Sequence, residues 1–592
     1  MSDLGPDAEV EDTLRPRRRR ADQRPPRWTW AVVVTTLLAV GLAYARVRWP
    51  GFLPLGSDND EYQLVGQALA AFEPPVVAGV EGTKYPLGYP AILAILEWLR
   101  LPVAPAALVL NLLAVAATTG LVSWTAGRAT SMLPPSPGAA LAAGGLVVAS
   151  VAVWNDAFSV MPEMLTMAVV AAMLAVVAGP PDGRGLTAGR LVALTVLSVA
   201  AVLLKTLAVV VVLGGCSLLL LRAWLLRRRG GTSTEAAPWK LIQPALWSVV
   251  VVVAGMLAMR PYPEHTTGYL ATFFLRDPFD ASLGSLGPLG LLERTWQGVP
   301  DTLADLGRAL LLIDASSEVA AVVAVVVLTL AAVAAFRLRP GGPLGAFVVG
   351  GVVAYAVALS AWPYHSSRFG LPLVPMGALA AGWLVRLVSD GSAGSGGSGG
   401  GDGGVGGAGA ADPAGGVGGV AAADAVDGAG GVGGADAVGR RHDGQPFHRR
   451  AQPQVVIGLL VGFLVLGGLV VTSWQGAVDR GASSAERLAT QHAAMDTLAD
   501  WAEDELQSDD VLISFDYREV ARRLDREVWP LAYTSDPDAL WGMVEEADAE
   551  VVLQVSFHAT RDRQLEKLLS SRPERFEQVL EGDGLGAWRV VE

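Results

Sequence analysis

The sequence predicts an all-α polytopic membrane protein with about eleven transmembrane helices, followed by a small extracytoplasmic α/β domain. Of 592 residues, 52% are hydrophobic and 17% are charged, and the apolar residues gather in long blocks, which is typical of a membrane chain. After about residue 479 the pattern changes, because short apolar runs alternate with amphipathic helical stretches. The single cysteine, Cys216, excludes an intramolecular disulfide and a cysteine-based metal cluster.

The basic, proline-rich start at residues 1–27 is expected to be disordered and cytoplasmic. Its arginine run is better explained as a topology anchor than as a nucleic-acid arm, because a polytopic chain needs such an anchor. No nucleic-acid partner is therefore expected. The next segment is predicted to be a retained transmembrane helix, since its apolar run is too long for a signal peptide.

Apolar segments predict ten transmembrane helices in residues 28–390 and one in 454–473. They cover 28–45, 104–126, 138–154, 160–178, 190–204, 207–221, 241–259, 319–336, 344–361, 371–387 and 455–471. With the N-terminus inside, the arginine-rich turns after the even-numbered helices are cytoplasmic, as the positive-inside rule requires. The long loops 47–103 and 260–317, and all the candidate chemistry, then lie on the outer face of the cell membrane.

The stretch 391–453 is predicted to be a disordered cytoplasmic linker, because it is rich in Gly and Ala and has no aromatic residue before position 447. The last transmembrane helix then places the α/β domain, 479–592, outside the cytoplasm. Strands are expected at 511–516 and 550–556, with helices from 483, 536 and 561. No nucleophile or metal constellation is visible in this domain, so a binding or packing role is expected.

The first outer loop carries three acids, Asp58, Asp60 and Glu61, between two segments that belong in lipid. A solvated loop, where carboxylates cost nothing, is the ordinary explanation for such acids, but an amphipathic helix containing Tyr62 follows directly. A Pro-rich turn at 84–90 then leads into another apolar helix. A carboxylate fixed on such a membrane-parallel helix could act as a general base toward an acceptor hydroxyl.

Two cations at the same face could bind a phosphate. Lys205 interrupts an apolar hairpin where a charge is expensive, although a snorkelling lysine is the alternative. Arg368, preceded by His365, opens the tenth transmembrane helix. Glu163 begins the fourth, as either a structural partner of one of these cations or a catalytic group.

Five motifs together resemble the GT-C glycosyltransferases, most closely the protein O-mannosyltransferase and aminoarabinose-transferase branch. The resemblance covers about residues 28–390, and its motifs share one membrane face. They are Asp58-x-x-x-Tyr62, Lys84-Tyr85-Pro86-Leu87-x-Tyr89, Met161-Pro162-Glu163, Lys205, and Arg368-Phe369-x-Leu371-Pro372-x-x-Pro375.

The resemblance implies a GT-C-like fold and an inverting glycosyltransferase in the cell membrane. Such an enzyme moves a hexose or pentose from a polyprenyl-phosphate-linked donor to an extracytoplasmic acceptor. Aligned on Tyr62, the family's catalytic aspartate falls on Asp58, while an Asp-Glu form of the motif falls on Asp60 and Glu61. The resemblance further implies donor phosphate binding by Lys84, Lys205 and Arg368, with help from His365, and supporting roles for Tyr62, Tyr85 and Glu163.

Several points stay open at the sequence level. The motif Trp-Trp-Asp of oligosaccharyltransferases is absent from the sequence, so the acceptor can be protein, lipid or cell-envelope glycan. No cofactor is required, although Asp58, Asp60 and Glu163 could bind a divalent metal. A lipid-carrier flippase or transporter, or a non-catalytic protein of envelope polysaccharide assembly, are the alternatives, but transporters usually have repeated halves and charges at mid-membrane.

Overall fold

A computed structural model describes most of residues 27–47, 57–228, 273–310, 317–394 and 489–591, and a few positions from 246 to 253. The described residues before Val388 and those from 489 onward belong to one compact unit. The basic start, Lys84, the helix expected at 455–471, nearly all of that expected at 241–259 and the linker after Gly394 lie outside the described residues.

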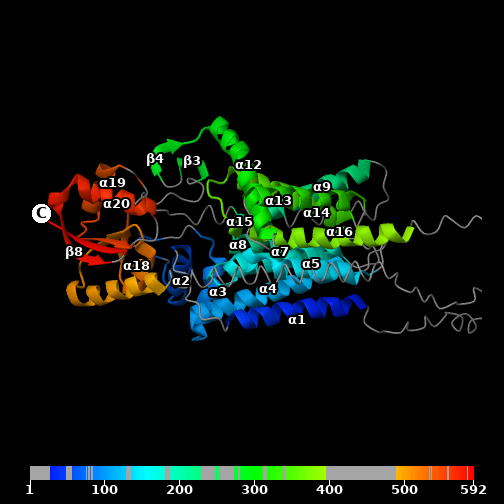
Figure 1. The fold of residues 1–592 in the computed structure, drawn as a ribbon, viewed down its shortest axis with the longest axis horizontal. Coiled ribbons are helices and arrows are strands. Elements are labelled where there is room, and N and C mark those ends of the chain that lie inside the picture. Colours follow the sequence, from blue (N-terminus) through cyan, green and yellow to red (C-terminus); the bar gives the residue numbers. More distant parts are fainter. Residues whose placement is uncertain are drawn as a thin grey trace, which may run out of the picture. The chain divides into compact units, whose positions relative to one another are not determined.

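Long apolar helices make up the membrane part (Figure 1). They are α1 (Arg27–Val47), α4 (Val103–Gly127), α5 (Pro137–Ala149), α6 (Val151–Ala157), α7 (Glu163–Ala178), α8 (Ala188–Leu204), α9 (Ala208–Arg228), α13 (Ser317–Arg337), α14 (Gly342–Ala361) and α16 (Val374–Gly394). Within the described residues, three helices are long and apolar enough to cross a membrane, or four if a bent pair is one span. The predicted class is confirmed, whereas the number of eleven stays a prediction.

The bent pair is α5 and α6, which meet at Ser150 with an angle of 53°. The Ser150 side chain ends one helix and starts the next, because its hydroxyl accepts the Val153 N–H at the start of α6. The same hydroxyl donates to the Ala309 carbonyl at 2.7 Å and so ties the bend to a later helix. Because of this bend, α6 runs in a different direction from α5 and leads into the turn before α7.

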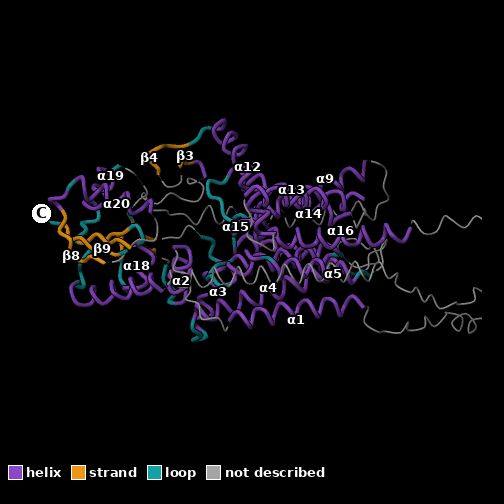
Figure 2. Tube along the Cα trace, in the orientation of Figure 1, coloured by secondary structure: helices purple, strands orange, loops and turns teal. Residues whose placement is uncertain are grey.

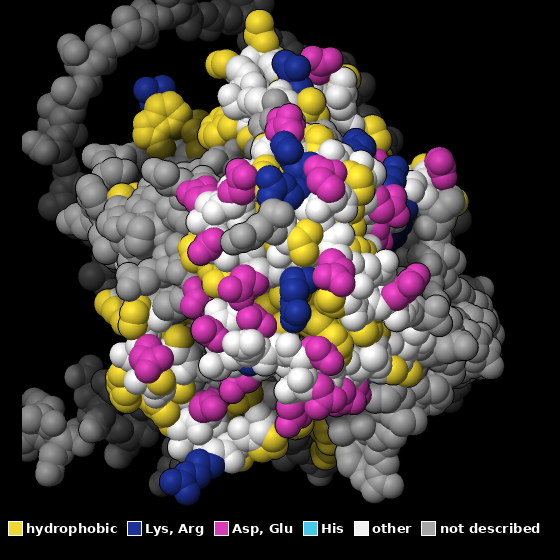
Figure 3. All heavy atoms as spheres, turned by 90° about the vertical axis from the view of Figure 1, so that its left-hand side faces the viewer, with side chains coloured by type: hydrophobic (Ala, Val, Ile, Leu, Met, Phe, Trp, Pro, Cys, Tyr) yellow, Lys and Arg dark blue, Asp and Glu magenta, His cyan; other side chains and the backbone are white. Residues whose placement is uncertain are grey.

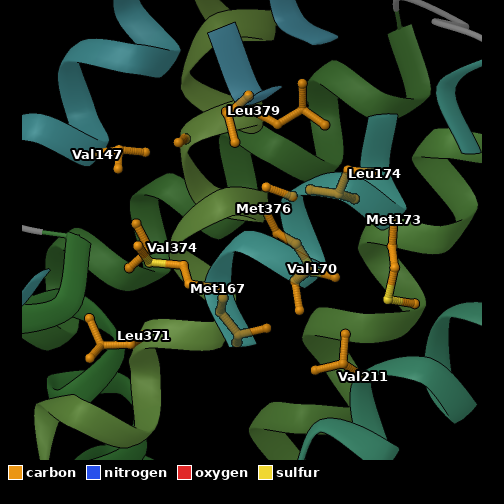
Figure 4. Close-up of a cluster of buried hydrophobic side chains, with 14 of the residues drawn as sticks. Val147, Met167, Val170, Met173, Leu174, Val211, Leu371, Val374, Met376 and Leu379 are labelled. Carbon is orange, nitrogen blue, oxygen red and sulfur yellow. The ribbon is translucent and has the colours of Figure 1, made fainter. Parts of the chain in front are cut away.

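The core of the membrane part is built around α7. Figure 4 shows Met167, Val170, Met173 and Leu174 of this helix among aliphatic side chains of neighbouring helices, including Val211. These side chains are buried almost completely. Methionine fills irregular gaps between helices because its unbranched side chain is flexible. The packing holds α7 rigidly, and Glu163 is its first residue.

Glycine allows α9 and α14 to approach closely. A Cβ atom on Gly350 would overlap the backbone of Gly214, and a Cβ on Gly214 would overlap the backbone of Gly350. Small residues at a membrane helix interface let the backbones pack directly, which is the main source of helix association in lipid. This contact fixes α14, and through it the segment that carries Arg368.

The first outer loop folds as α2 (Ser57–Ala70), a short hairpin of β1 (Val76–Val77) and β2 (Val80–Glu81), and α3 (Gly88–Trp98). The acids predicted to precede an amphipathic helix instead lie in its first turn, where the helix dipole favours negative charge. The second outer loop, expected as an amphipathic loop, contains the hairpin of β3 (Leu275–Asp277) and β4 (Asp280–Ser285) and the 23-residue helix α12 (Pro288–Leu310).

The C-terminal domain has a five-stranded mixed sheet in the order β6-β5-β7-β9-β8 (Figure 2). Its strands are β5 (Leu512–Ser514), β6 (Val528–Pro530), β7 (Val551–Val555), β8 (Phe576–Gly582) and β9 (Leu585–Val590). Strands β6, β5 and β7 are parallel, and β9 is antiparallel to β7 and β8. The predicted α/β pattern is confirmed, and β5 and β7 lie within the two expected strands, whereas β6, β8 and β9 were not among them.

Four helices accompany this sheet: residues 489–505, α18 (Tyr517–Leu524), α19 (Pro537–Glu546) and α20 (Ala559–Ser571). Acidic side chains are spread over one face of the molecule (Figure 3). The short helix α18 was not predicted, and it contacts α2.

The glycine contact gives a test of the membrane packing. Gly350→Ala should destabilise the protein by about 1–3 kcal/mol, because the added methyl group forces α9 and α14 apart. Gly145→Ala is the matched control, since a Cβ atom there meets nothing within 4 Å. Thermal unfolding in detergent should show a lower midpoint for the first variant only, and equal midpoints would contradict the close approach.

Candidate functional site

Asp58 lies at the centre of the site, in the first turn of α2. Its carboxylate accepts a hydrogen bond from Arg368 Nη2 at 2.7 Å and another from the Tyr85 hydroxyl. Arg368 belongs to the short helix α15 (Ser367–Gly370), which leads through the 3₁₀ turn Leu371–Leu373 into α16. The pair is only partly buried, with 20% of the Asp58 side chain exposed, so a substrate could reach the carboxylate.

Tyr85 belongs to the turn that was predicted to be rigid. Its ring centroid lies 4.5 Å from that of Tyr62, and Tyr62 in turn meets Tyr89 edge-on at 5.3 Å. Burial, followed by the charges of Asp58 and Glu61, raises the pKa of Tyr85 well above its ordinary value. The phenol therefore stays protonated and donates to Asp58.

Helix α8 packs against the same turn and restrains it. A Cβ atom on Gly88 would lie 2.6 Å from the carbonyl oxygen of Leu203, so only glycine allows this contact. Leu203 lies two residues before Lys205, and the contact therefore brings the start of α3 against the end of α8. Two parts of the predicted site, the tyrosine turn and Lys205, are joined by backbone packing.

Lys205 forms a buried ion pair with Glu163, and the Nζ to Oε1 distance is 2.9 Å. The interpretation of Glu163 as the structural partner of a cation agrees with this contact. The Lys205 ammonium also lies 5.1 Å from the centroid of the Phe369 ring, and the Arg368 guanidinium lies 5.0 Å from the same ring. The aromatic ring thus brings both predicted phosphate-binding cations together.

The position of Phe369 is itself fixed by α14, because the Tyr355 hydroxyl donates to the Phe369 carbonyl at 2.8 Å. The second terminal nitrogen of Arg368, Nη1, lies 3.5 Å from the sulfur of Met161. A thioether is a weak acceptor, so this nitrogen keeps most of its capacity to donate to a stronger acceptor.

His365 lies near this cluster, and its Nδ1 is 3.5 Å from a carboxylate oxygen of Asp305 on α12. Asp305 also interacts with Arg308 one turn later at 3.5 Å. His365 therefore joins α12 to the segment that carries Arg368. Lys84, the third cation predicted to bind phosphate, lies outside the described residues, and its role stays a prediction.

The other two acids of α2 face the C-terminal domain. Glu61 lies 2.6 Å from Arg518 Nε, and Asp60 pairs with Arg522. Both arginines come from α18, and both carboxylates are almost completely buried. The three acids of the first turn are thus separated: Asp58 meets the membrane part, while Asp60 and Glu61 meet the C-terminal domain.

Glu519, between the two arginines, is buried as well, and its Oε2 atom has no hydrogen-bond partner among the described residues. Burial, and then the nearby charges of Asp516 and Asp60, raise the pKa of Glu519 to about 8. Near neutral pH this side chain is mostly protonated. The contact region therefore contains a carboxyl group that is sensitive to pH.

Four contributors were missed from the sequence: Asp156, Asp305, Arg518 and Arg522. The charges of Glu163, Arg368 and Lys205 all act on Asp156, at the end of α6. The sequence did indicate Asp156, because Asn155-Asp156 precedes the Met161-Pro162-Glu163 motif on the same predicted membrane face. For Arg518 and Arg522 the sequence indication was weaker: the two residues have an i, i+4 spacing within a strongly charged stretch.

Metal binding by the acids has little support in the geometry. Asp58, Asp60 and Glu163 each pair with a different cation. Among the described residues, no group of three or more His, Cys, Asp or Glu side chains is arranged to hold a metal ion.

No protein-family model matches the chain, and no curated protein sequence matches it significantly. Its structure is similar to that of ArnT from Cupriavidus metallidurans bound to undecaprenyl phosphate, with a TM-score of 0.50 and 13% identity. This match covers 96% of the chain and 99% of ArnT.

The structure is also similar to the archaeal oligosaccharyltransferase AglB from Archaeoglobus fulgidus in complex with an inhibitory peptide and a dolichol-phosphate. The TM-score is 0.50, the identity is 11%, and the match covers 96% of the chain and 74% of AglB. At such identities the similarity shows the fold, so the chain has a GT-C-like fold, as the sequence predicted.

The buried ion pair gives a test of the site's rigid part. Glu163→Gln should destabilise the protein by about 3–5 kcal/mol, because it leaves the Lys205 charge buried without its partner. The double variant Lys205→Met/Glu163→Leu should recover most of this loss, since no charge is then left. Thermal unfolding in detergent measures both, and a single variant as stable as the wild type would contradict the pairing.

Glu519 gives a pH-dependent test. Because its pKa is raised in the folded protein, its contribution to stability is fully present below a pH of about 4.5 and is lost as the pH rises through about 8. Hydrogen exchange of α18 in the full chain should therefore speed up between pH 6 and about pH 9 more than fully exposed amides do. In Glu519→Gln, this additional acceleration of exchange with pH should be much smaller.

Exposed Glu545 on α19 offers the control, because Glu545→Gln should leave the pH dependence of α18 unchanged. If the additional acceleration of α18 exchange persists in Glu519→Gln, another titrating group is responsible for it.

Proposed function

We propose that this protein is a membrane glycosyltransferase that moves a sugar from a polyprenyl-phosphate donor to an acceptor outside the cytoplasm. The observation that carries the proposal is the arrangement around Phe369, where Asp58 pairs with Arg368, and Arg368 and Lys205 both lie against the same aromatic ring. A carboxylate that can take a proton, next to cations that can hold a phosphate, is the set of groups that this reaction needs. The GT-C-like fold supports the same class of reaction.

In the proposed reaction, Asp58 accepts the proton of the acceptor hydroxyl as its oxygen attacks the anomeric carbon of the sugar. The bond between that carbon and the phosphate oxygen breaks, and its electron pair leaves with the phosphate. The new bond forms on the opposite side of the ring, so the configuration inverts. The lipid phosphate gains one negative charge, and the protein gains one proton on the carboxylate.

Arg368 and Lys205 would stabilise the charge that develops on the leaving phosphate. Arg368 Nη1 is suited to this role, because a phosphate oxygen is a much stronger acceptor than the Met161 sulfur it now faces. Lys205 is held by Glu163, so it would act mainly through its charge. Lys84 and His365 are the further phosphate-binding candidates, and Tyr62 and Tyr85 orient the base.

Asp58 is preferred over Asp60 and Glu61 as the base because of its partners. Asp58 is partly exposed and pairs with Arg368, whereas the other two are buried against arginines of the C-terminal domain. The similar structures support a lipid partner of this kind, since one contains undecaprenyl phosphate and the other a dolichol-phosphate. The reaction is placed at the outer face of the cell membrane by the distribution of arginine in the predicted turns.

Substitution of Asp58 tests the assignment. Asp58→Asn should lower transfer by about 10²–10⁴-fold, because the amide cannot accept the hydroxyl proton. Transfer of radiolabel from a panel of undecaprenyl-phosphate hexoses and pentoses to envelope extracts measures the effect in purified protein. Gln67→Ala, at an exposed position of α2, is the matched control and should transfer normally.

Binding of undecaprenyl phosphate should be kept in the Asp58→Asn variant, which separates loss of chemistry from loss of the site. Normal transfer by Asp58→Asn would contradict the mechanism, and a larger loss in Asp60→Asn would move the base to Asp60. If no donor supports transfer but vesicles containing the protein move undecaprenyl phosphate between leaflets, a flippase replaces the enzyme.

A further inference from the structure

Helix α18 of the C-terminal domain presents two arginines on one face. Arg518 and Arg522 are four residues apart, so both side chains point to the same side of the helix. That side meets α2, and the two helices lie next to each other in Figure 1. Arg523, the next residue, points elsewhere and pairs with exposed Asp496 within the same domain.

The contact is charged, and its carboxylates are buried. Glu61 and Arg518 have 2% and 10% of their side chains exposed, and their atoms are 2.6 Å apart. Asp60, with 1% of its side chain exposed, pairs with Arg522, whose side chain is 31% exposed. A buried ion pair contributes little net stability, because its desolvation cost offsets most of the attraction. Such pairs instead favour one specific geometry, because any shift of the helices leaves charges buried without partners.

The geometry selected here is that of the helix turn that carries Asp58. Asp58 and Asp60 lie in the first turn of α2 and Glu61 follows directly, so fixing Asp60 and Glu61 restrains the backbone at Asp58. On the other side, Asp58 meets Arg368 in a partly exposed pair and accepts from Tyr85, and α3 packs along α2. If Arg368 turns toward a phosphate during the reaction, the pairs with α18 still restrain this turn.

We propose that Arg518 and Arg522 are positioning residues, through which the C-terminal domain holds α2 so that Asp58 meets the acceptor hydroxyl in the reactive geometry. The proposal rests on the proposed function of Asp58. It gives the C-terminal domain a part in the active site. Neither arginine touches the substrate, and both act through Asp60 and Glu61.

The electrostatic surroundings agree with this role. The region holds four carboxyl groups, those of Asp60, Glu61, Asp516 and Glu519, and the two arginines. The charge of Arg518 also acts on Tyr85, the residue that donates to Asp58. A change at α18 therefore reaches the catalytic carboxylate by two routes, the α2 backbone and the Tyr85 hydroxyl.

The test uses the full chain and the double variant Arg518→Gln/Arg522→Gln. Turnover should fall by roughly 10–100-fold, the size of effect that a displacement of about 1 Å causes, while binding of undecaprenyl phosphate changes less than about twofold. Hydrogen exchange of residues 57–70 should speed up. Arg523→Gln, on the same helix but away from α2, is the control and should leave turnover and exchange unchanged.

Charge exchange shows whether the pairing itself matters. Arg522→Asp alone should lose turnover, and the combination Arg522→Asp/Asp60→Arg should recover a large part of it. A purely structural role would not predict recovery of turnover at constant donor binding. If the double glutamine variant does not fold, this pair of variants decides, and a failure to recover overturns the proposal.

Normal turnover in the double glutamine variant overturns the proposal, and so does lost turnover with unchanged exchange in 57–70. If the wild type itself transfers no sugar, the proposed function fails. The exchange measurement then still decides whether the arginines hold α2, so the two failures are distinguishable.

Discussion

The ion pair of Asp58 with Arg368 joins residues 310 positions apart in the chain, and the site depends on it. Asp58 lies at the start of α2 and Arg368 lies just before the last described membrane helix, so neither segment alone can fix the position of the Asp58 carboxylate. Charges at a membrane surface are costly unless they are paired, and this cost makes the pairing a constraint on the fold. Lys205 with Glu163, and the α18 arginines with Asp60 and Glu61, follow the same rule.

The membrane helices were predictable because lipid imposes a long apolar run on each of them. Most predicted helix ends lie within a few residues of the helix ends in the structure, as for α4 and α14. Helix α12 was missed for a physical reason: Pro300 lies inside it, and several apolar residues such as Trp296 are exposed, so the pattern resembled a loop. The break at Ser150 was also invisible, because its capping bonds depend on the three-dimensional packing.

The candidate residues of the site were also visible, since an ionisable group beside a membrane helix is conspicuous in a sequence. The partners of these residues could not be identified from the sequence. Nothing local indicates that Lys205 meets Glu163, or that Asp60 and Glu61 meet a domain more than 400 residues later. Helix α18 has eight residues, fewer than the window of about 11 residues over which a helical period can be recognised. Its position depends on charges that it meets only in the folded chain.

The pairs differ in burial, and this difference divides the site into a rigid and an adjustable half. Lys205 and Glu163 are buried beside the core of α7 and fixed by Phe369, so they form a rigid platform. Asp58 and Arg368 are partly exposed, and a partly exposed pair is weaker and easier to open. In the proposed reaction, a donor phosphate that takes over Arg368 would release Asp58 for the acceptor, so one contact would both bind the donor and free the proposed base.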